Sequence, residues 1–287
     1  MTAGILPAVS VFGQDSLSIR RQNRNIAVGS AAVYSIGLVG LNSLWYSDYE
    51  RSSFHSFNDN SEWLQMDKVG HAYSTYTLTN LSYQLYRKGN RAHQKRALAY
   101  SSASAFLFLT TVEVFDGYSK EWGFSWGDFT ANSAGIGLFV AQELLFQQQI
   151  LRLKYSYTNT KYRNLRPNTF GENTLQSAFK DYNGQTYWAS FNLNALSNKV
   201  KPKWLNFAVG YSVDQMVFSS AEDVLFDGKR YSPRREYLFS LDLDWEKIET
   251  KKKWLSYVFK VANCIKIPAP AILINGKGNL EYRALYF

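Results

Sequence analysis

The hydrophobic period of the chain changes near residue 150. Four apolar stretches of helical length with polar residues at regular positions precede this point: 25–45, 66–87, 93–118 and 126–149. Beyond it, apolar and polar residues alternate, most regularly over 237–246. Alternation of this kind, with aromatic and β-branched residues, is typical of strands. The sequence therefore predicts an α+β fold, in which an N-terminal bundle of about four helices precedes an antiparallel β-rich half.

The β-rich half is consistent with two architectures. Its polar positions carry charges, which would face water in an open sheet and would line the lumen of a transmembrane barrel. The run 280–287 alternates and ends in Phe287, which resembles the signal by which outer-membrane barrels are recognised for assembly. The sequence shows about six clear strand runs, whereas a closed barrel usually needs about eight; fainter runs near 161–165 and 217–226 could supply the others. Residues 251–265 predict an amphipathic helix, and Pro268 and Pro270, which follow it, do not suit a central strand. A small or partial outer-membrane-type barrel and an open sheet both remain as predictions.

The N-terminal residues indicate export from the cytoplasm. Residues 1–13 end in Val11-Phe12-Gly13, which resembles the end of a signal peptide. Aromatic residues make up 16% of the chain and suit membrane interfaces, with an aromatic-rich soluble core as the alternative. We therefore predict a signal-peptide remnant over 1–13, a helical domain over 25–149 and a β-rich outer-membrane-type region over 150–287.

The charge distribution disfavours a nucleic-acid partner. The net charge is +9, but the basic residues are dispersed, and neither zinc-finger spacing nor an RNA-binding aromatic signature is present. Anionic lipid or lipopolysaccharide is the better-suited partner. The single cysteine, Cys264, excludes an internal disulfide and a cysteine-cluster metal site.

Three of the predicted helices each carry polar residues on one face. Their spacing of three or four residues places the members of each group side by side. The groups are Asp67 with Lys68 and His71, Glu113 with Asp116, and Asp128 with Asn132. If these faces meet, they form an internal site with one histidine and several carboxylates.

This set of residues has three interpretations. As a metal site, it would offer a divalent cation His71, Glu113, Asp116 and Asp128. As a catalytic site, the same four residues would act with His71 as general base, although no Ser or Cys nucleophile lies in a recognisable elbow. As a structural network, Asp67, Lys68, His71, Glu113, Asp116, Asp128 and Asn132 would fix the helix register without a cofactor.

The motifs in these helices resemble a known family. The patterns DKxxH at 67–71, ExxDG at 113–117 and WGFSWGDFxxNxxG at 122–135 resemble the YfiM-like family of uncharacterised bacterial envelope proteins. They are more distantly similar to the VanZ-like family, which is associated with glycopeptide-antibiotic resistance. The resemblance covers about residues 60–147 and implies no activity. Some family members are lipoproteins, whereas this chain has no N-terminal cysteine; its length resembles long members from Bacteroidota.

Two functional hypotheses follow, both in the cell envelope. The first is a non-enzymatic accessory or scaffold subunit of an outer-membrane protein complex for barrel assembly, secretion or surface-protein biogenesis. It requires no cofactor, and its partners are outer-membrane proteins. The second is an envelope enzyme that acts on lipid, lipopolysaccharide or cell-wall precursors through His71 and its carboxylates. We expect a bacterial outer-membrane location with a periplasmic portion, with the inner membrane as the alternative.

Overall fold

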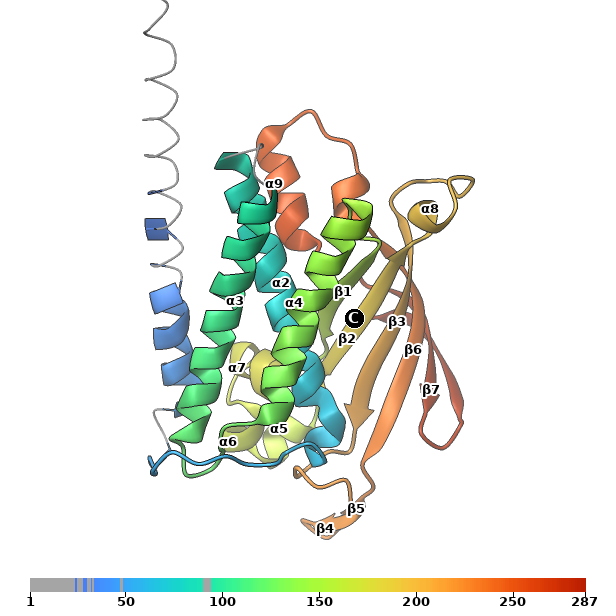
Figure 1. The fold of residues 1–287 in the computed structure, drawn as a ribbon. Coiled ribbons are helices and arrows are strands. Elements are labelled where there is room, and N and C mark those ends of the chain that lie inside the picture. Colours follow the sequence, from blue (N-terminus) through green and yellow to red (C-terminus); the bar gives the residue numbers. More distant parts are fainter. Residues whose placement is uncertain (1–23, 25–27, 30–31, 33, 47–48, 90–93) are drawn as a thin grey trace, which may run out of the picture.

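A computed structural model of the 287-residue chain describes residues 24, 28–29, 32, 34–46, 49–89 and 94–287. It consists of a helical layer packed beside a curled antiparallel sheet (Figure 1). The predicted α+β fold is confirmed. The predicted signal-peptide remnant, residues 1–13, lies outside the described residues, as do residues 25–27, 30–31 and 33 of the first predicted helix.

Three long helices form the main part of the helical layer: α2 (Met66–Gly89), α3 (Gln94–Gly117) and α4 (Trp126–Phe146). Tyr76 and Tyr83 of α2 pack edge-on against the ring of Phe139 of α4, with Leu98 of α3 in the same buried cluster. A helical segment at 34–41 continues into η1 (Asn42–Tyr46) and lies beside α3. Among the described residues, α3 is the helix that is long and apolar enough to cross a membrane, a property that core helices of soluble proteins share.

Helices α2 and α4 approach each other closely because α4 has a glycine at their contact. A Cβ atom on Gly135 would lie 2.1 Å from the carbonyl oxygen of Ala72. Helix α4 begins at an N-cap, where the Ser125 side chain accepts a hydrogen bond from the backbone N–H of Asp128. This cap fixes the start of the helix and therefore the position of Asp128.

The sheet has the strand order β1-β2-β3-β6-β7-β8, and all its neighbouring strands are antiparallel. Its strands are β1 (Leu151–Tyr157), β2 (Gln185–Asn192), β3 (Leu205–Asp214), β6 (Arg234–Leu243), β7 (Ala269–Asn275) and β8 (Leu280–Tyr286). A separate hairpin pairs β4 (Val224–Phe226) with β5 (Lys229–Tyr231). The two edge strands of this sheet are β1 and β8, and they do not pair with each other. The part of the chain that the structure describes therefore contains an open sheet and no closed barrel.

Short helices fill the connections between strands. They are α5 (Tyr162–Leu165), α6 (Pro167–Phe170), α7 (Thr174–Lys180), α8 (Leu193–Leu196), η3 (Trp245–Lys247) and α9 (Lys253–Ala262), while η2 (Glu62–Gln65) leads into α2. The amphipathic helix expected near 251–265 is thus present as α9. The fainter strand predicted at 161–165 is wrong, because these residues form α5. Pro270 does lie in β7 between two strands, where a register shift between Ala269 and Ala271 accommodates it.

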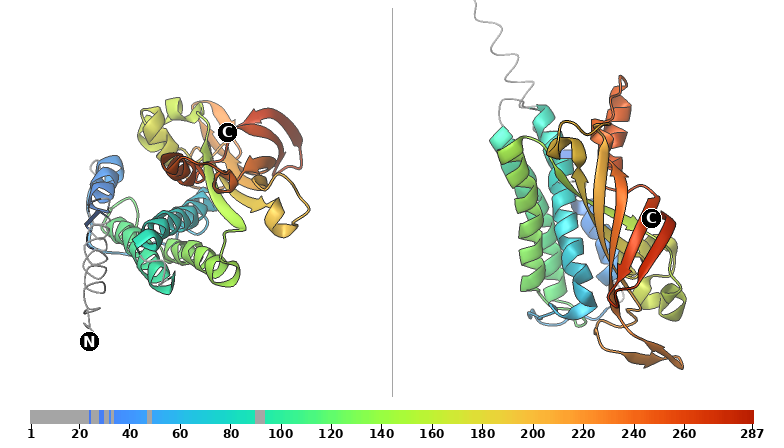
Figure 2. Two further views of the ribbon diagram at one scale, coloured as in Figure 1. Left: turned by 90° about the horizontal axis from the view of Figure 1, so that it is seen from above. Right: turned by 90° about the vertical axis from the view of Figure 1, so that its right-hand side faces the viewer.

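The two faces of the sheet differ in chemistry. On the concave face, Lys154, Ser190 and Asp242 are buried together with the ring of Trp188. On the other face, Tyr155 and Tyr187 pack against Tyr73 of α2. The helical layer lies beside one side of the sheet (Figure 2). The outer face is therefore mainly apolar, whereas the concave face combines buried polar residues with an apolar cluster of Trp188, Ala208, Leu238, Ala271 and Leu273.

The open sheet curls until its last strand approaches its first two. The Tyr286 hydroxyl of β8 lies 2.9 Å from Thr186 Oγ1 of β2, and its ring packs edge-on against Trp188. At the edge of β1, Tyr155 makes an isolated parallel bridge to Ile265. These contacts enclose the polar concave face without completing a ring of paired strands.

Candidate functional site

The polar residues predicted on three helices meet at His71. Its Nδ1 lies 3.1 Å from Asn132 Oδ1 of α4 and 3.4 Å from Glu113 Oε1 of α3. Its Nε2 lies 3.7 Å from Asp67 Oδ1, one turn earlier on α2. The imidazole ring therefore contacts all three helices, as the shared spacing predicted. We call the group formed by Asp59, Asp67, Lys68, His71, Glu113, Asp116, Asp128 and Asn132 the His71 cluster.

Lys68 joins the aspartates at one end of the His71 cluster. Its Nζ lies 2.6 Å from Asp59, 3.0 Å from Asp128 and 3.6 Å from Asp67. The Ser125 hydroxyl donates a 2.7 Å hydrogen bond to Asp59. The Lys68 side chain is largely shielded from water, so these ionic contacts are stronger than those of a surface pair.

Two tyrosines from outside the three helices complete the cluster. The Tyr46 hydroxyl of η1 donates a 2.7 Å hydrogen bond to Asp116 Oδ1. The Tyr182 hydroxyl, which follows α7, donates a 2.8 Å hydrogen bond to Asp67 Oδ1. Sequence spacing did not identify Asp59, Tyr46 or Tyr182, because these residues reach the cluster through tertiary contacts rather than through a helical repeat.

Burial changes the ionisation of the cluster. It raises the pKa of Glu113 to about 8 and that of Asp116 to about 7, and neighbouring carboxylates act in the same direction. Burial opposes protonation of His71, but the charges of Asp67, Glu113 and Asp116 raise its pKa above the ordinary value. The cluster therefore holds protons near neutral pH, a property that catalytic, ion-binding and structural sites share.

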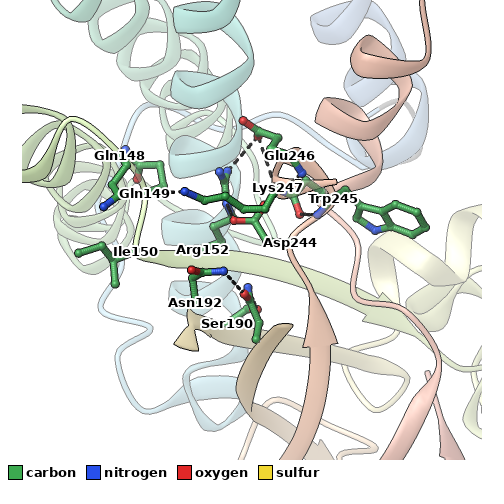
Figure 3. Close-up of polar contacts among 12 residues, drawn as sticks. Gln148, Gln149, Ile150, Arg152, Ser190, Asn192, Asp244, Trp245, Glu246 and Lys247 are labelled. Carbon is green, nitrogen blue, oxygen red and sulfur yellow. Dashed lines mark hydrogen bonds and ion pairs between the residues drawn. The ribbon is translucent and has the colours of Figure 1, made fainter. Parts of the chain in front are cut away.

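A second polar cluster joins the helical layer to the sheet (Figure 3). Arg152 of β1 lies between two carboxylates, with Nε 3.2 Å from Asp244 and Nη1 3.0 Å from Glu246. Lys247 donates a 3.0 Å hydrogen bond to Gln148 beyond the end of α4. Arg152, Glu246 and Lys247 line a cavity of about 270 Å³. No regular spacing in the sequence predicted this group of residues, because its members come from the ends of separate elements.

Glutamines in and just after α4 fix the chain where it enters the sheet. The Gln142 side-chain oxygen accepts hydrogen bonds from the backbone N–H groups of Ile150 and Leu151, at 2.9 and 2.8 Å. The Tyr76 hydroxyl donates to Gln149 and so ties α2 to the same turn. These bonds satisfy buried polar groups at the junction of the two layers, which indicates a structural role for this second region.

Comparison with known families gives a match to the helical layer. Residues 55–143 match the model of a family described as a predicted periplasmic lipoprotein (DUF2279). This part of the chain is similar to an uncharacterised family of cell-envelope proteins. The matched residues contain α2, α3 and most of α4, and therefore every member of the His71 cluster. Comparison with curated proteins and with solved structures gives no match.

The family match bears on two predictions from the sequence. It supports a location in the cell envelope and a resemblance to envelope proteins of unknown function. The strand-rich residues that follow 143 lie outside the match, so their role rests on the structure alone.

Proposed function

We propose that this protein is a non-enzymatic accessory subunit of an outer-membrane protein complex, and that its sheet docks on a partner outer-membrane protein. The observation that carries the proposal is the open edge at β8. Leu280, Tyr282 and Leu285 expose 69%, 71% and 72% of their surface. Within the described residues, β8 pairs with β7 along one edge, and no strand pairs with its other edge. An open apolar edge is a liability for a solitary protein and a ready template for a partner strand.

The outer face of the sheet supports the same proposal. Over β1 and β2 this face is covered by α2, but further along the sheet Tyr237, Leu241 and Ile272 are exposed. Charged residues such as Lys154 and Asp242 lie buried on the opposite face. Apolar side chains outside and charged side chains inside are typical of outer-membrane strands, and contiguous exposed apolar patches mark contact sites.

The envelope location is consistent with this kind of complex. The match to a predicted periplasmic lipoprotein family supports a protein that acts outside the cytoplasm. We propose barrel assembly, secretion or surface-protein biogenesis as the process that the complex serves. The net charge of +9 further favours contact with anionic lipid or lipopolysaccharide.

We also propose that the helical layer is of the YfiM-like, and more distantly VanZ-like, type. The DKxxH pattern places Asp67, Lys68 and His71 in one cluster, and the later motifs supply Glu113 and Asp128 to the same place. The three sequence motifs therefore contribute residues to one buried site. No activity is transferred by this resemblance.

The proposed function is tested by native purification of a tagged chromosomal copy from separated outer and inner membranes in mild detergent. The test variant is Tyr282→Lys with Leu285→Lys on β8. The control is Leu175→Lys with Phe179→Lys on α7, where the side chains are similarly exposed. We expect a stoichiometric outer-membrane partner with the wild type and the control, and its loss in the β8 variant. Purification of the wild type without a partner would contradict the proposal. Equal amounts of the partner with the wild type, the β8 variant and the α7 control would contradict it as well.

An envelope enzyme acting on lipid, lipopolysaccharide or cell-wall precursors is the second candidate. It is favoured by the contact of His71 with Glu113, whose pKa is raised to about 8. His71 lies outside the lining of the cavity of about 270 Å³ near Arg152. The variants His71→Ala and Asp128→Asn separate the two: an enzyme loses turnover while it stays folded, whereas a structural network loses several kcal/mol of stability.

A further inference from the structure

The His71 cluster holds more negative groups than positive ones. Its carboxylates are Asp59, Asp67, Glu113, Asp116 and Asp128, and its cationic groups are Lys68 and His71. Five carboxylates against two cations leave an excess of three, even when the imidazole is protonated. Buried carboxylates in such excess require protons or a further cation.

Three buried polar atoms at the centre of the cluster have no hydrogen-bond partner. They are Glu113 Oε1, Asp128 Oδ1 and Asn132 Nδ2, on residues that expose 1%, 3% and 0% of their surface. Two of these atoms do have ionic contacts, since Asp128 Oδ1 lies 3.0 Å from Lys68 Nζ and Glu113 Oε1 lies 3.4 Å from His71 Nδ1. Atoms without a hydrogen-bond partner are uncommon in a folded protein. Glu113 Oε1 and Asp128 Oδ1 are carboxylate oxygens that can accept a cation, whereas Asn132 Nδ2 is an N–H donor. The two buried oxygens beside one histidine therefore point to an ion-binding site.

The donor atoms are already grouped. Asp67, His71 and Asp128 each offer one ligand atom, and these atoms all lie within 4.8 Å of one another. The Nδ1 of His71 is occupied by Asn132, which leaves Nε2, on the side of Asp67, for a metal ion. A metal-binding histidine typically uses its other ring nitrogen in this way, because the hydrogen bond fixes the tautomer and the ring orientation.

The other acidic residues have different partners. Asp116 accepts the hydrogen bond from Tyr46, and Asp59 accepts from Ser125 and pairs with Lys68 at 2.6 Å. Glu113 faces the Nδ1 side of the imidazole ring. Asp67 and Asp128 also have partners, Tyr182 and Lys68. They differ from the other carboxylates because an oxygen of each and one ring nitrogen of His71 all lie within 4.8 Å of one another.

We propose that Asp67, His71 and Asp128 bind one divalent metal ion, with Asn132 and Glu113 orienting the imidazole. One imidazole and two carboxylates form a mixed nitrogen and oxygen donor set, which suits Zn²⁺ or Mn²⁺ better than Mg²⁺ or Ca²⁺. The set differs from the one predicted from sequence, because Glu113 and Asp116 are supporting residues rather than ligands. This proposal goes beyond the accessory role and does not depend on it.

The experiment uses the full chain, purified in mild detergent and stripped of metal with a chelator. Zn²⁺, Mn²⁺ and Mg²⁺ are titrated by calorimetry, and elemental analysis gives the stoichiometry. We expect one equivalent of Zn²⁺ or Mn²⁺ and weaker binding of Mg²⁺. Asp67→Asn should weaken binding by at least about tenfold, and Asn132→Ala by about 10- to 100-fold, the range for residues that orient a ligand.

The matched control is His55→Gln, since His55 lies on a loop outside the cluster and contacts Ser52 and Ser53. Its metal affinity should equal that of the wild type. Circular dichroism shows whether each variant is folded, and metal-dependent thermal stabilisation of the wild type tests the proposal without any variant. Absence of binding and of stabilisation in the wild type would overturn the proposal. Equal affinity of wild type and a folded Asp67→Asn variant, or preference for Mg²⁺, would overturn it as well.

Discussion

The Lys154 ammonium lies 2.8 Å from the Asp242 carboxylate, and both side chains are completely shielded from solvent. Strands β1 and β6 carry these residues on the concave face of the sheet, where the Ser190 hydroxyl donates a further 2.7 Å hydrogen bond to Asp242. Burial lowers the pKa of Lys154. The opposite charges of Lys154 and Asp242 therefore hold the pair together, and each buried charge is compensated by the other.

Removal of one partner should be far more costly than removal of both. Asp242→Asn leaves a buried uncompensated lysine and should lower the free energy of unfolding by about 3–5 kcal/mol. The double variant Lys154→Met with Asp242→Leu should recover most of that loss. Denaturant unfolding of the detergent-solubilised protein measures both values. Equal destabilisation by the single and double variants would contradict this account of the pair.

Lys266 predicts a pH dependence of stability. The pKa of Lys266 is lowered from 10.5 to about 8, because burial and the charge of nearby Lys154 lower it by more than the charge of Asp242 raises it. Its Nζ lies 4.6 Å from the centre of the Trp188 ring. Between pH 8 and 10.5 the unfolded chain holds a proton that folded Lys266 has lost, so this residue makes the free energy of unfolding rise with pH.

The variant Lys266→Met isolates this contribution. The free energy of unfolding of the wild type minus that of the variant should increase between pH 8 and pH 10, by up to about 3 kcal/mol in full. Below pH 8 the difference should be constant, since both states of the wild type are then protonated. A difference that is flat over the whole range would show that Lys266 keeps an ordinary pKa.

Two glycines on α4 should respond in opposite directions to the same substitution. Gly135→Ala places a Cβ 2.1 Å from the Ala72 carbonyl oxygen and should destabilise the protein by about 1–3 kcal/mol or more. Gly137 has nothing within 4 Å of an added Cβ, so Gly137→Ala should stabilise it by up to about 1 kcal/mol through helix propensity. Thermal unfolding compares the two. A similar change in both would mean that α2 and α4 are less closely packed than the structure shows.

Much of the fold follows from periodicity in the sequence. The helical repeat predicted α2 to α4, and the alternation predicted β1, β2, β3 and β6, because each pattern reports which face of an element is buried. The segment 161–165 was misassigned, since a short run carries too few residues to separate a strand from one helical turn. Pro270 was expected not to lie in a central strand, but the register shift beside it removes the need for its missing N–H.

The His71 cluster was predicted in part. Helical spacing identified Asp67, His71 and Asp128, because three and four residue intervals place side chains on one face. Spacing gave no information on Asp59 or Tyr182, because Asp59 precedes α2 and Tyr182 follows α7, so that neither lies on the helical repeat of α2, α3 or α4. Tertiary contacts of this kind depend on how the layers pack, and a single sequence contains no direct record of that packing.

The central claim is that β8 docks on a partner outer-membrane protein, and photo-cross-linking tests it most directly. A photoreactive residue is placed at Leu285 of β8, and in a control at Leu175 of α7, both exposed by about seven-tenths. The account predicts that the Leu285 probe forms one dominant adduct with an outer-membrane protein in living cells and that the Leu175 probe does not. Adducts at Leu285 with lipid alone, or the same adducts from both positions, would contradict the claim.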